Sequence, residues 1–207
     1  SDSMAFYAAG QAGRSALDLP ESTLALYPDT FTRYSQDYTF TPDFPTTARL
    51  FESLWDRTDG SQFDGVMSID PVVLAHMLEV LGPVDLPTGE QITSENAVKL
   101  LLSDAYQRFG DAGDNGRSSD EFFAMVSSTV FSRLAGGQWN PIAMFDQLTR
   151  SAQEQRINLW FTDEQAQALV TEVGLDGGLR PDNTASTQLG IYLNDFSIGK
   201  LEYHLTT

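Results

Sequence analysis

The 207-residue chain contains no cysteine, few basic residues and no long apolar run. Without thiols it can form neither disulfides nor thiolate metal sites, and a cysteine nucleophile is excluded. No stretch approaches the roughly 18 consecutive apolar residues that a membrane-spanning helix needs. The lack of cysteine excludes thiol chemistry, and the lack of a long apolar run excludes a helical membrane span within these residues.

The charge balance is strongly acidic, with 29 acidic against 12 basic residues and a formal net charge of −17. A nucleic-acid backbone requires clustered Lys and Arg, so we expect no DNA or RNA partner. The same negative charge opposes binding to an anionic membrane surface. We therefore expect membrane association only through an anchor upstream of this chain.

The most informative stretch is 64–71 (DGVMSIDP), which predicts a short buried strand that runs directly into a helix. Asp70 is a good N-cap acceptor, and Pro71 suits the first helical position, where its missing N–H is not needed. Gly82 and Pro83 then end the helix. Its apolar face repeats at helical spacing and consists of Leu74, Met77, Leu78 and Leu81.

Other segments show similar start and stop signals. Helices are predicted at about 45–57, after Thr93, from the Ser118 capping box to Gly136, from Asn140 to Gln155 and after the Thr162 cap, with strands at 84–87 and 157–161. In the helix after Thr93, the apolar stripe is predicted to contain Val98, Leu101, Leu102, Ala105, Tyr106 and Phe109.

Strands that alternate with helices in the middle of the chain, and hairpins predicted at 3–19 and 188–205, indicate an α/β fold with α+β character at the ends. This fold is expected to have a mixed central sheet flanked by helices. One domain covering residues 1–207 is the expected count for this length. Because the first residues read as a strand that starts in mid-fold, we expect the C-terminal part of a longer, membrane-anchored protein.

No motif names a reaction, because the chain has neither a Gly-x-Ser-x-Gly elbow nor a Gly-x-x-x-x-Gly-Lys phosphate loop. Whether the protein is an enzyme stays open. Aromatic side chains can stack on sugars, line a lipid tunnel or fill the core. Those in question are Tyr34, Tyr38, Phe40, Trp55, Trp139 and Trp160.

Two arginines, Arg108 and Arg117, flank a polar loop between predicted helices. Arg117 precedes a helix N-terminus, whose free N–H groups favour anions, and a guanidinium there can clamp phosphate in a bidentate way. Surface ion pairs with Asp111, Asp114 or Asp120 account for the same arginines without any ligand. Both interpretations stay open.

Asp111 and Asp114 are candidate ligands for Ca²⁺ or Mg²⁺, which prefer hard oxygen donors. The EF-hand spacing is not met, because counting from Asp111 puts a glycine at position 3 and a phenylalanine at position 12. A solvated acidic turn is the alternative. Asp64, at the end of the first strand, could face a cleft, although a turn with Gly65 explains it equally well.

Several short stretches, taken together, resemble domain-of-unknown-function family 4012 (DUF4012). They are TPDFP at 41–45, the run 64–71, LGPV at 81–84, NAV at 96–98, DAY at 104–106, the pattern RxxxW at 156–160 with Gln165, GxYxND at 190–195 and KxxYxL at 200–205. The resemblance thus extends from about residue 41 to the end. It implies a membrane-anchored, extracytoplasmic protein of Gram-positive bacteria, linked to envelope or exopolysaccharide functions and without a settled activity.

The chain is also similar to the LytR-CpsA-Psr phosphotransferases in the order of its predicted elements. That order is a strand, a helix, a Gly-Pro-Val-Asp strand, a helix that ends at Arg108, and a loop that ends in Asp114-x-Gly-Arg117. That resemblance implies a polyprenyl pyrophosphate bound in an apolar tunnel, with arginines and Mg²⁺ at the pyrophosphate. It makes Arg108, Asp114 and Arg117 the candidate ligand-binding residues. The chain departs from the pattern at 120–121, where Asp-Glu replaces Arg-Gln, and has one arginine where a pair is expected at Arg108.

Three functions follow as expectations. The first is an extracytoplasmic cell-envelope domain that binds a cell-wall glycan or a lipid-linked glycan intermediate. The second is a divergent LytR-CpsA-Psr-like transferase that acts on a polyprenyl-linked glycopolymer with Mg²⁺. The third is a non-catalytic structural interaction module.

Overall fold

The computed structural model describes residues 17, 19–28, 30–58, 62–109, 117–179 and 190–192. The chain divides into two compact units. Of the described residues, those up to 67 and those from 158 onward belong to the first unit, and those from 68 to 157 belong to the second. The single-domain organisation predicted above stays a prediction.

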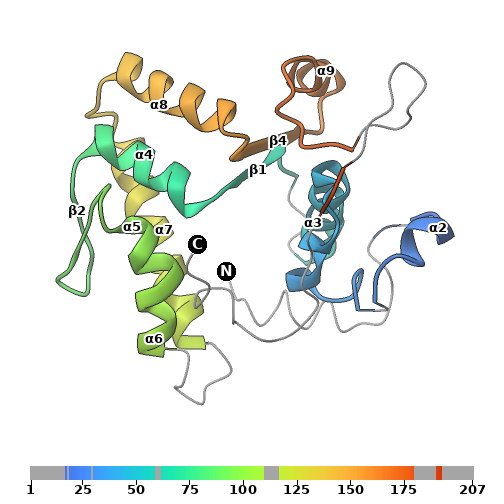
Figure 1. Cartoon of the computed structure of the whole chain (residues 1–207), viewed down its shortest axis with the longest axis horizontal. Coiled ribbons are helices and arrows are strands. Elements are labelled where there is room, and N and C mark those ends of the chain that lie inside the picture. The colour runs from blue at the N-terminus through green and yellow to red at the C-terminus, as the bar shows by residue number, and fades with distance from the viewer. Residues whose placement is uncertain are drawn as a thin grey trace. The chain divides into compact units, whose positions relative to one another are not determined.

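The first unit is built around one long helix, α3, with a shorter helix contributed from late in the chain (Figure 1). Its helical elements are α2 (Glu21–Leu24), the 3-10 turn η1 (Ser35–Phe40), α3 (Phe44–Thr58) and α9 (Glu164–Glu172). α3 buries Leu50 and Leu54 completely against Phe31 and Tyr38. This cluster anchors the segment around Phe31 and Tyr38 to α3.

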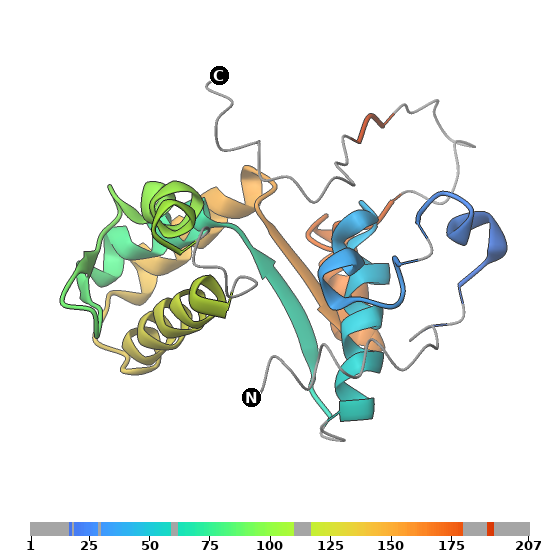
Figure 2. The same cartoon turned by 90° about the horizontal axis from the view of Figure 1, so that it is seen from below.

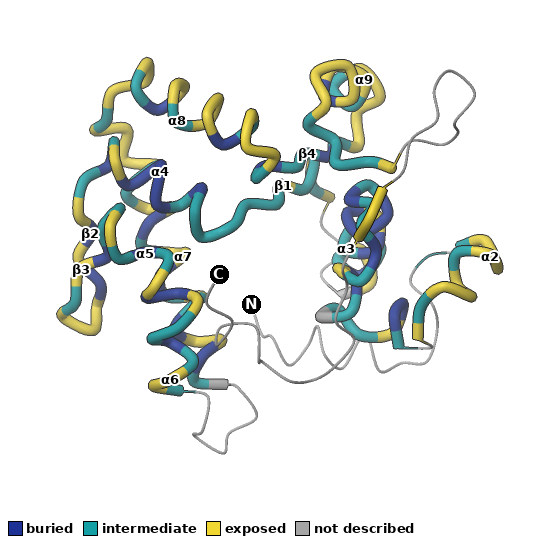
Figure 3. The backbone as a smooth tube through the Cα atoms, viewed as in Figure 1, coloured by how far each residue is buried: buried dark blue, intermediate teal, exposed yellow. Residues whose placement is uncertain are grey.

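The second unit is mainly helical. Its elements are α4 (Pro71–Leu81), β2 (Val84–Asp85), β3 (Gln91–Ile92), α5 (Ala97–Lys99), the π-helical turn η2 (Leu100–Asp104), α6 (Ala105–Phe109), α7 (Arg117–Ala135) and α8 (Pro141–Gln153). α4 packs against α5 and α8, and α6 packs against α7. Along α4 most residues are buried, whereas exposed and covered positions alternate along α8 (Figure 3).

The strands β1 (Gly65–Ile69) and β4 (Ile157–Phe161) pair with each other and lie side by side (Figure 2). The Thr162 N–H donates to the Asp64 carbonyl at one end (3.0 Å), and an Asp70–Arg156 ion pair lies at the other, so the two strands run antiparallel. The boundary between the two units falls within both strands.

The predicted fold class is confirmed, because the chain mixes helices and strands. The described strands form two two-stranded sheets, β1–β4 and the antiparallel hairpin β2–β3, in place of one central sheet. β2 and β3 are two residues long and joined by a tight turn at Gly89, so they pair only with each other. The hairpins predicted at 3–19 and 188–205 lie almost wholly outside the described residues.

The order of strand and helix predicted at 64–71 is confirmed, but the strand is not buried: no residue of β1 is fully buried, and Met67 is 51% exposed. The ends of the helix are as predicted. The Asp70 Oδ1 atom accepts hydrogen bonds from the Val72 and Val73 N–H groups, both at 2.9 Å, so Asp70 is the N-cap of α4. Pro71 occupies the first helical position, and Gly82 ends the helix with a φ of 72°. These residues fix both ends of α4.

Three other local predictions are wrong. α7 begins at Arg117, so Ser118 lies inside the helix and is not the N-cap of the predicted capping box. Leu102 is 46% exposed, whereas Leu100 is buried, because the π-helical turn η2 shifts the buried face by one residue within the helix after Thr93. Before α9, Asp163 is the N-cap in place of Thr162, since its carboxylate accepts the Ala166 N–H at 2.8 Å. A carboxylate one residue later competes well for the same role.

Gly65 is the position where the β1–β4 pairing leaves least room. A Cβ atom there would lie 2.4 Å from the Trp160 carbonyl oxygen and 2.8 Å from the Phe161 ring. We expect Gly65→Ala to lower the free energy of unfolding by about 1–3 kcal/mol, because the backbone of β4 must shift. Urea unfolding measures this effect.

Gly136→Ala is the matched control, because its Cβ would meet nothing closer than 3.3 Å. We expect this control to be neutral or to stabilise by up to about 1 kcal/mol. Equal stability of the two variants would show that β4 does not pack against Gly65 as described.

Candidate functional site

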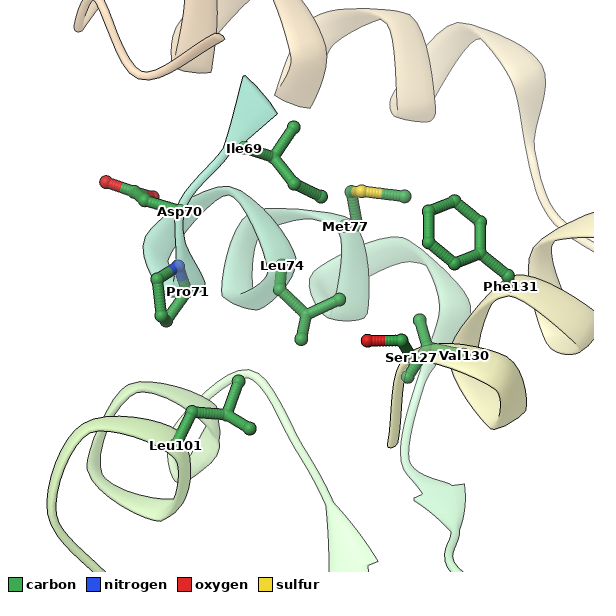
Figure 4. Close-up of a pocket in the computed structure, with 9 residues that line it drawn as sticks. All are labelled: Ile69, Asp70, Pro71, Leu74, Met77, Leu101, Ser127, Val130 and Phe131. Carbon is green, nitrogen blue, oxygen red and sulfur yellow. The ribbon is translucent and has the colours of Figure 1, made fainter. Parts of the chain in front are cut away.

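An apolar pocket of about 170 Å³ lies in the second unit, where the start of α4 faces η2 and α7 (Figure 4). Nine residues line it: Ile69, Asp70, Pro71, Leu74, Met77, Leu101, Ser127, Val130 and Phe131. Seven of these side chains are apolar, and Asp70 points away from the group around Leu74 and Met77 (Figure 4). Concave, mostly apolar sites with a few polar groups are typical of small-ligand binding.

The local sequence places these walls. The β1-to-α4 junction brings Ile69 and Pro71 to the pocket, and the helical period of α4 adds Leu74 and Met77. On the opposite wall, Val130 and its neighbours repeat on one face of α7. The pocket is therefore held by regular elements.

Beside the pocket, Asp70 begins a chain of ion pairs. Its Oδ2 atom accepts from Arg156 Nη1 at 2.5 Å, and Arg156 Nε donates to Glu154 at 3.0 Å. Arg150 continues the chain, at 3.1 Å from Glu154 and 3.5 Å from Glu79. Three carboxylates face two guanidiniums, so this network has a net charge of −1.

The ion pairs change the acidity of their members. The hydrogen bond with Asp70, and its charge, raise the pKa of Arg156 above its ordinary value. Desolvation alone raises the pKa of Glu154, but hydrogen bonds from Arg150 and Arg156 outweigh it, so the pKa of Glu154 is lowered. Both shifts favour the charged forms of Arg156 and Glu154.

The second unit also contains a serine beside a histidine. The Ser151 hydroxyl is 2.9 Å from His76 Nδ1 and also 2.9 Å from the Gln147 carbonyl oxygen. Which of the two groups donates in the Ser151–His76 contact depends on the imidazole tautomer. Because Ser151 is 0% exposed, the pair serves to satisfy buried polar groups.

A more open hollow of about 570 Å³ lies in the first unit, along one face of α9. Phe161 forms one side of it, and polar side chains of α9 form another. Gln167 is held in place there, since its Oε1 atom accepts the Phe161 N–H at 2.8 Å. The hollow is thus lined by one aromatic ring with amide, hydroxyl and carboxylate groups beside it.

Of the residues proposed from the sequence, the structure describes the side chains of Arg108 and Asp64. Arg108 ends at Glu90, 2.6 Å away, in an exposed ion pair. Asp64 is exposed, and its carbonyl serves the β1–β4 pairing. Arg117 begins α7, but its side chain is not described, and Asp111 and Asp114 lie outside the described residues. None of the described candidates lines the apolar pocket.

Within the described ranges no group of three or more His, Asp or Glu side chains could hold a metal ion. The proposed metal ligands Asp111 and Asp114 stay a prediction, because they fall in the undescribed loop. No helix in the described part of the chain is long and apolar enough to cross a membrane.

A comparison with family models finds one match, to a protein of unknown function (DUF4012), over residues 2–106. This segment is half of the chain. The chain belongs to the DUF4012 family. Searches of the curated proteins and of the solved structures find no significant match.

The family match begins at residue 2, upstream of residue 41, at which the resemblance in the sequence begins, and it ends at Tyr106. The motifs at 156–160, 190–195 and 200–205 therefore lie outside it. Six of the nine pocket residues fall within the DUF4012 match, including Asp70 and Leu101. The sequence had marked Asp70 only as a helix cap, and Arg156 only as part of a motif.

Asp70 has two roles in this DUF4012 protein, and two substitutions separate them. Asp70→Asn keeps an N-cap acceptor but removes the charge that faces Arg156, whereas Asp70→Ala removes both. We expect Asp70→Ala to lower the free energy of unfolding by about 1–3 kcal/mol and Asp70→Asn by less than about 1 kcal/mol, because the ion pair is partly exposed.

Chemical denaturation of both variants beside the unmodified protein measures the two contributions. An equal loss in both variants would mean that the ion pair, and not the cap, stabilises the start of α4.

Proposed function

We propose that this protein is an extracytoplasmic domain of the bacterial cell envelope that binds a lipid-linked glycan intermediate, with an apolar part of the ligand in the α4–α7 pocket. The observation that carries the proposal is the apolar pocket at the start of α4. Membership of DUF4012 supports the setting only through the envelope role that the resemblance implies.

The size of the pocket limits what it can hold. An apolar cavity of about 150 Å³ accepts benzene, so a pocket of about 170 Å³ accepts a group of similar size. One isoprene unit, or two at most, fits this volume, whereas a long polyprenyl chain does not. The pocket therefore binds one end of the lipid chain, and the remainder of the ligand lies outside the pocket.

The charge beside the pocket limits the head group. The network from Asp70 to Glu79 has a net charge of −1, and the chain as a whole carries −17. Such a field disfavours an isolated phosphate near Asp70. A phosphate-bearing ligand needs a divalent cation such as Mg²⁺ to bind well, whereas an uncharged isoprenoid alcohol does not.

The transferase alternative gains no support from the described residues. Arg108, its principal candidate, is paired with Glu90 and does not line the pocket. A surface ion pair accounts for this arginine without a phosphate ligand.

The proposal predicts the order of affinity of three probes. We expect geraniol to bind, geranyl phosphate to bind weakly without Mg²⁺, and added Mg²⁺ to restore the affinity of geranyl phosphate. Ligand at about 100 times its dissociation constant stabilises the folded state by about 2.7 kcal/mol, which a melting-temperature shift detects.

Ser127→Leu and Ser128→Leu form a matched pair on α7. Both serines are exposed, but only Ser127 lines the pocket. The larger side chain at 127 fills the pocket, so the geraniol shift disappears in Ser127→Leu and persists in Ser128→Leu. If the unmodified protein shows no shift with any probe, lipid binding is excluded and the interaction module becomes the better explanation.

A further inference from the structure

The helical run from Ala97 to Phe109 is interrupted by the π-helical turn η2, although the run looks continuous in outline (Figure 1). Within it the Ala105 N–H donates to the Leu100 carbonyl, five residues back. An α-helix bonds residues four apart, and π turns are rare and often occur at functional sites. The π turn η2 is therefore a candidate functional element.

An ion pair spans the π-helical turn. Lys99 Nζ contacts both carboxylate oxygens of Asp104, at 2.9 and 3.2 Å. Residues five apart in an α-helix point about 140° away from each other, whereas they are stacked along a π turn. The Lys99–Asp104 contact therefore favours the π register over the α register.

The two ends of the run are held by separate contacts. At the start, the Thr93 N–H donates to Asn96 Oδ1 at 2.8 Å, which fixes the first turn beside the β2–β3 hairpin. At the end, Tyr106 and Phe109 contact rings of α7, with Phe109 centred 5.4 Å from Phe122. The segment between these two contacts is one residue longer than a regular α-helix would need, and η2 accommodates the extra residue.

The consequence is visible in the pocket wall. Leu100 and Leu101 are both buried, 5% and 9% exposed, and Leu102 points outward. Leu101 is the residue of this run that lines the pocket (Figure 4). A continuous α-helix follows the predicted apolar stripe, which contains Leu102 together with Leu101, so it would place Leu102 in place of Leu100 beside Leu101 on the buried face.

We propose that the π-helical turn is a positioning element of the ligand pocket, which places Leu101 in the wall, and that the Lys99–Asp104 pair holds it in this register. The inference deepens the proposed function and rests on it for the identity of the ligand. The role of the π turn in shaping the pocket is independent of the proposed function, because a small apolar probe reports the shape of the pocket directly.

Deletion of Leu102 tests the inference. It removes one exposed residue, lets α5 and α6 join in one α-helix, and brings Lys99 and Asp104 to the i, i+4 spacing that an α-helix favours. We expect an unchanged or higher melting temperature, but roughly tenfold weaker binding of benzene, measured by NMR titration, because Leu101 no longer contacts the probe as before.

Leu102→Ala is the matched control, because it removes the same exposed side chain and keeps the chain length. We expect its affinity for benzene to equal that of the unmodified protein. Unchanged benzene binding in the deletion variant would overturn the inference, and so would a complete lack of benzene binding by the unmodified protein.

A second pair of variants covers the case in which the deletion variant does not fold. Asp104→Asn weakens the ion pair that spans the turn, and Asp146→Asn removes the same charge from an exposed site on α8. We expect about twofold weaker benzene binding in Asp104→Asn alone, in keeping with a partly exposed ion pair. Equal affinities of these two variants would overturn the inference.

Geraniol, titrated into the same variants, separates the two proposals. If the unmodified protein binds benzene but not geraniol, the proposed lipid ligand is wrong, and the comparison of the deletion variant with Leu102→Ala still decides the role of the π turn.

Discussion

The start of α4 depends on one carboxylate. Asp70 caps the helix with Oδ1 and holds Arg156 with Oδ2, so the same side chain ends β1, begins α4 and fixes the residue that precedes β4. A cap oxygen contributes about 1 kcal/mol, and an ion pair that is more than one third exposed contributes less. The pocket lies directly beside this junction, so Asp70 organises one of its walls.

Charge and shape together narrow the chemistry of the pocket. The apolar lining favours a branched hydrocarbon group of limited size, and the adjacent carboxylates oppose a bare anion. A serine–histidine pair lies in the same unit, but the serine is completely buried, which favours a structural role for the pair. These observations favour binding over catalysis for the described residues.

The π turn connects two anchors that local rules set independently. The Thr93–Asn96 hydrogen bonds fix one end of the helical run, and aromatic contacts to α7 fix the other. One extra residue between them is accommodated by a wider turn, which buries Leu100 and exposes Leu102. Because the pocket draws Leu101 from this turn, its wall depends on contacts that lie outside the pocket.

By itself, the sequence determined the family, the mixed helix-and-strand class and most element boundaries, because caps, prolines and periodic apolar residues act within three or four positions. Only the tertiary structure decided that Arg156 pairs with Asp70, 86 positions away, that Arg108 pairs with Glu90, and that Leu101 faces a pocket. The periodicity after Thr93 was compatible with a plain α-helix. The π turn arises only when both ends of that helix pack against other elements, and such distant contacts leave no local signal in the chain.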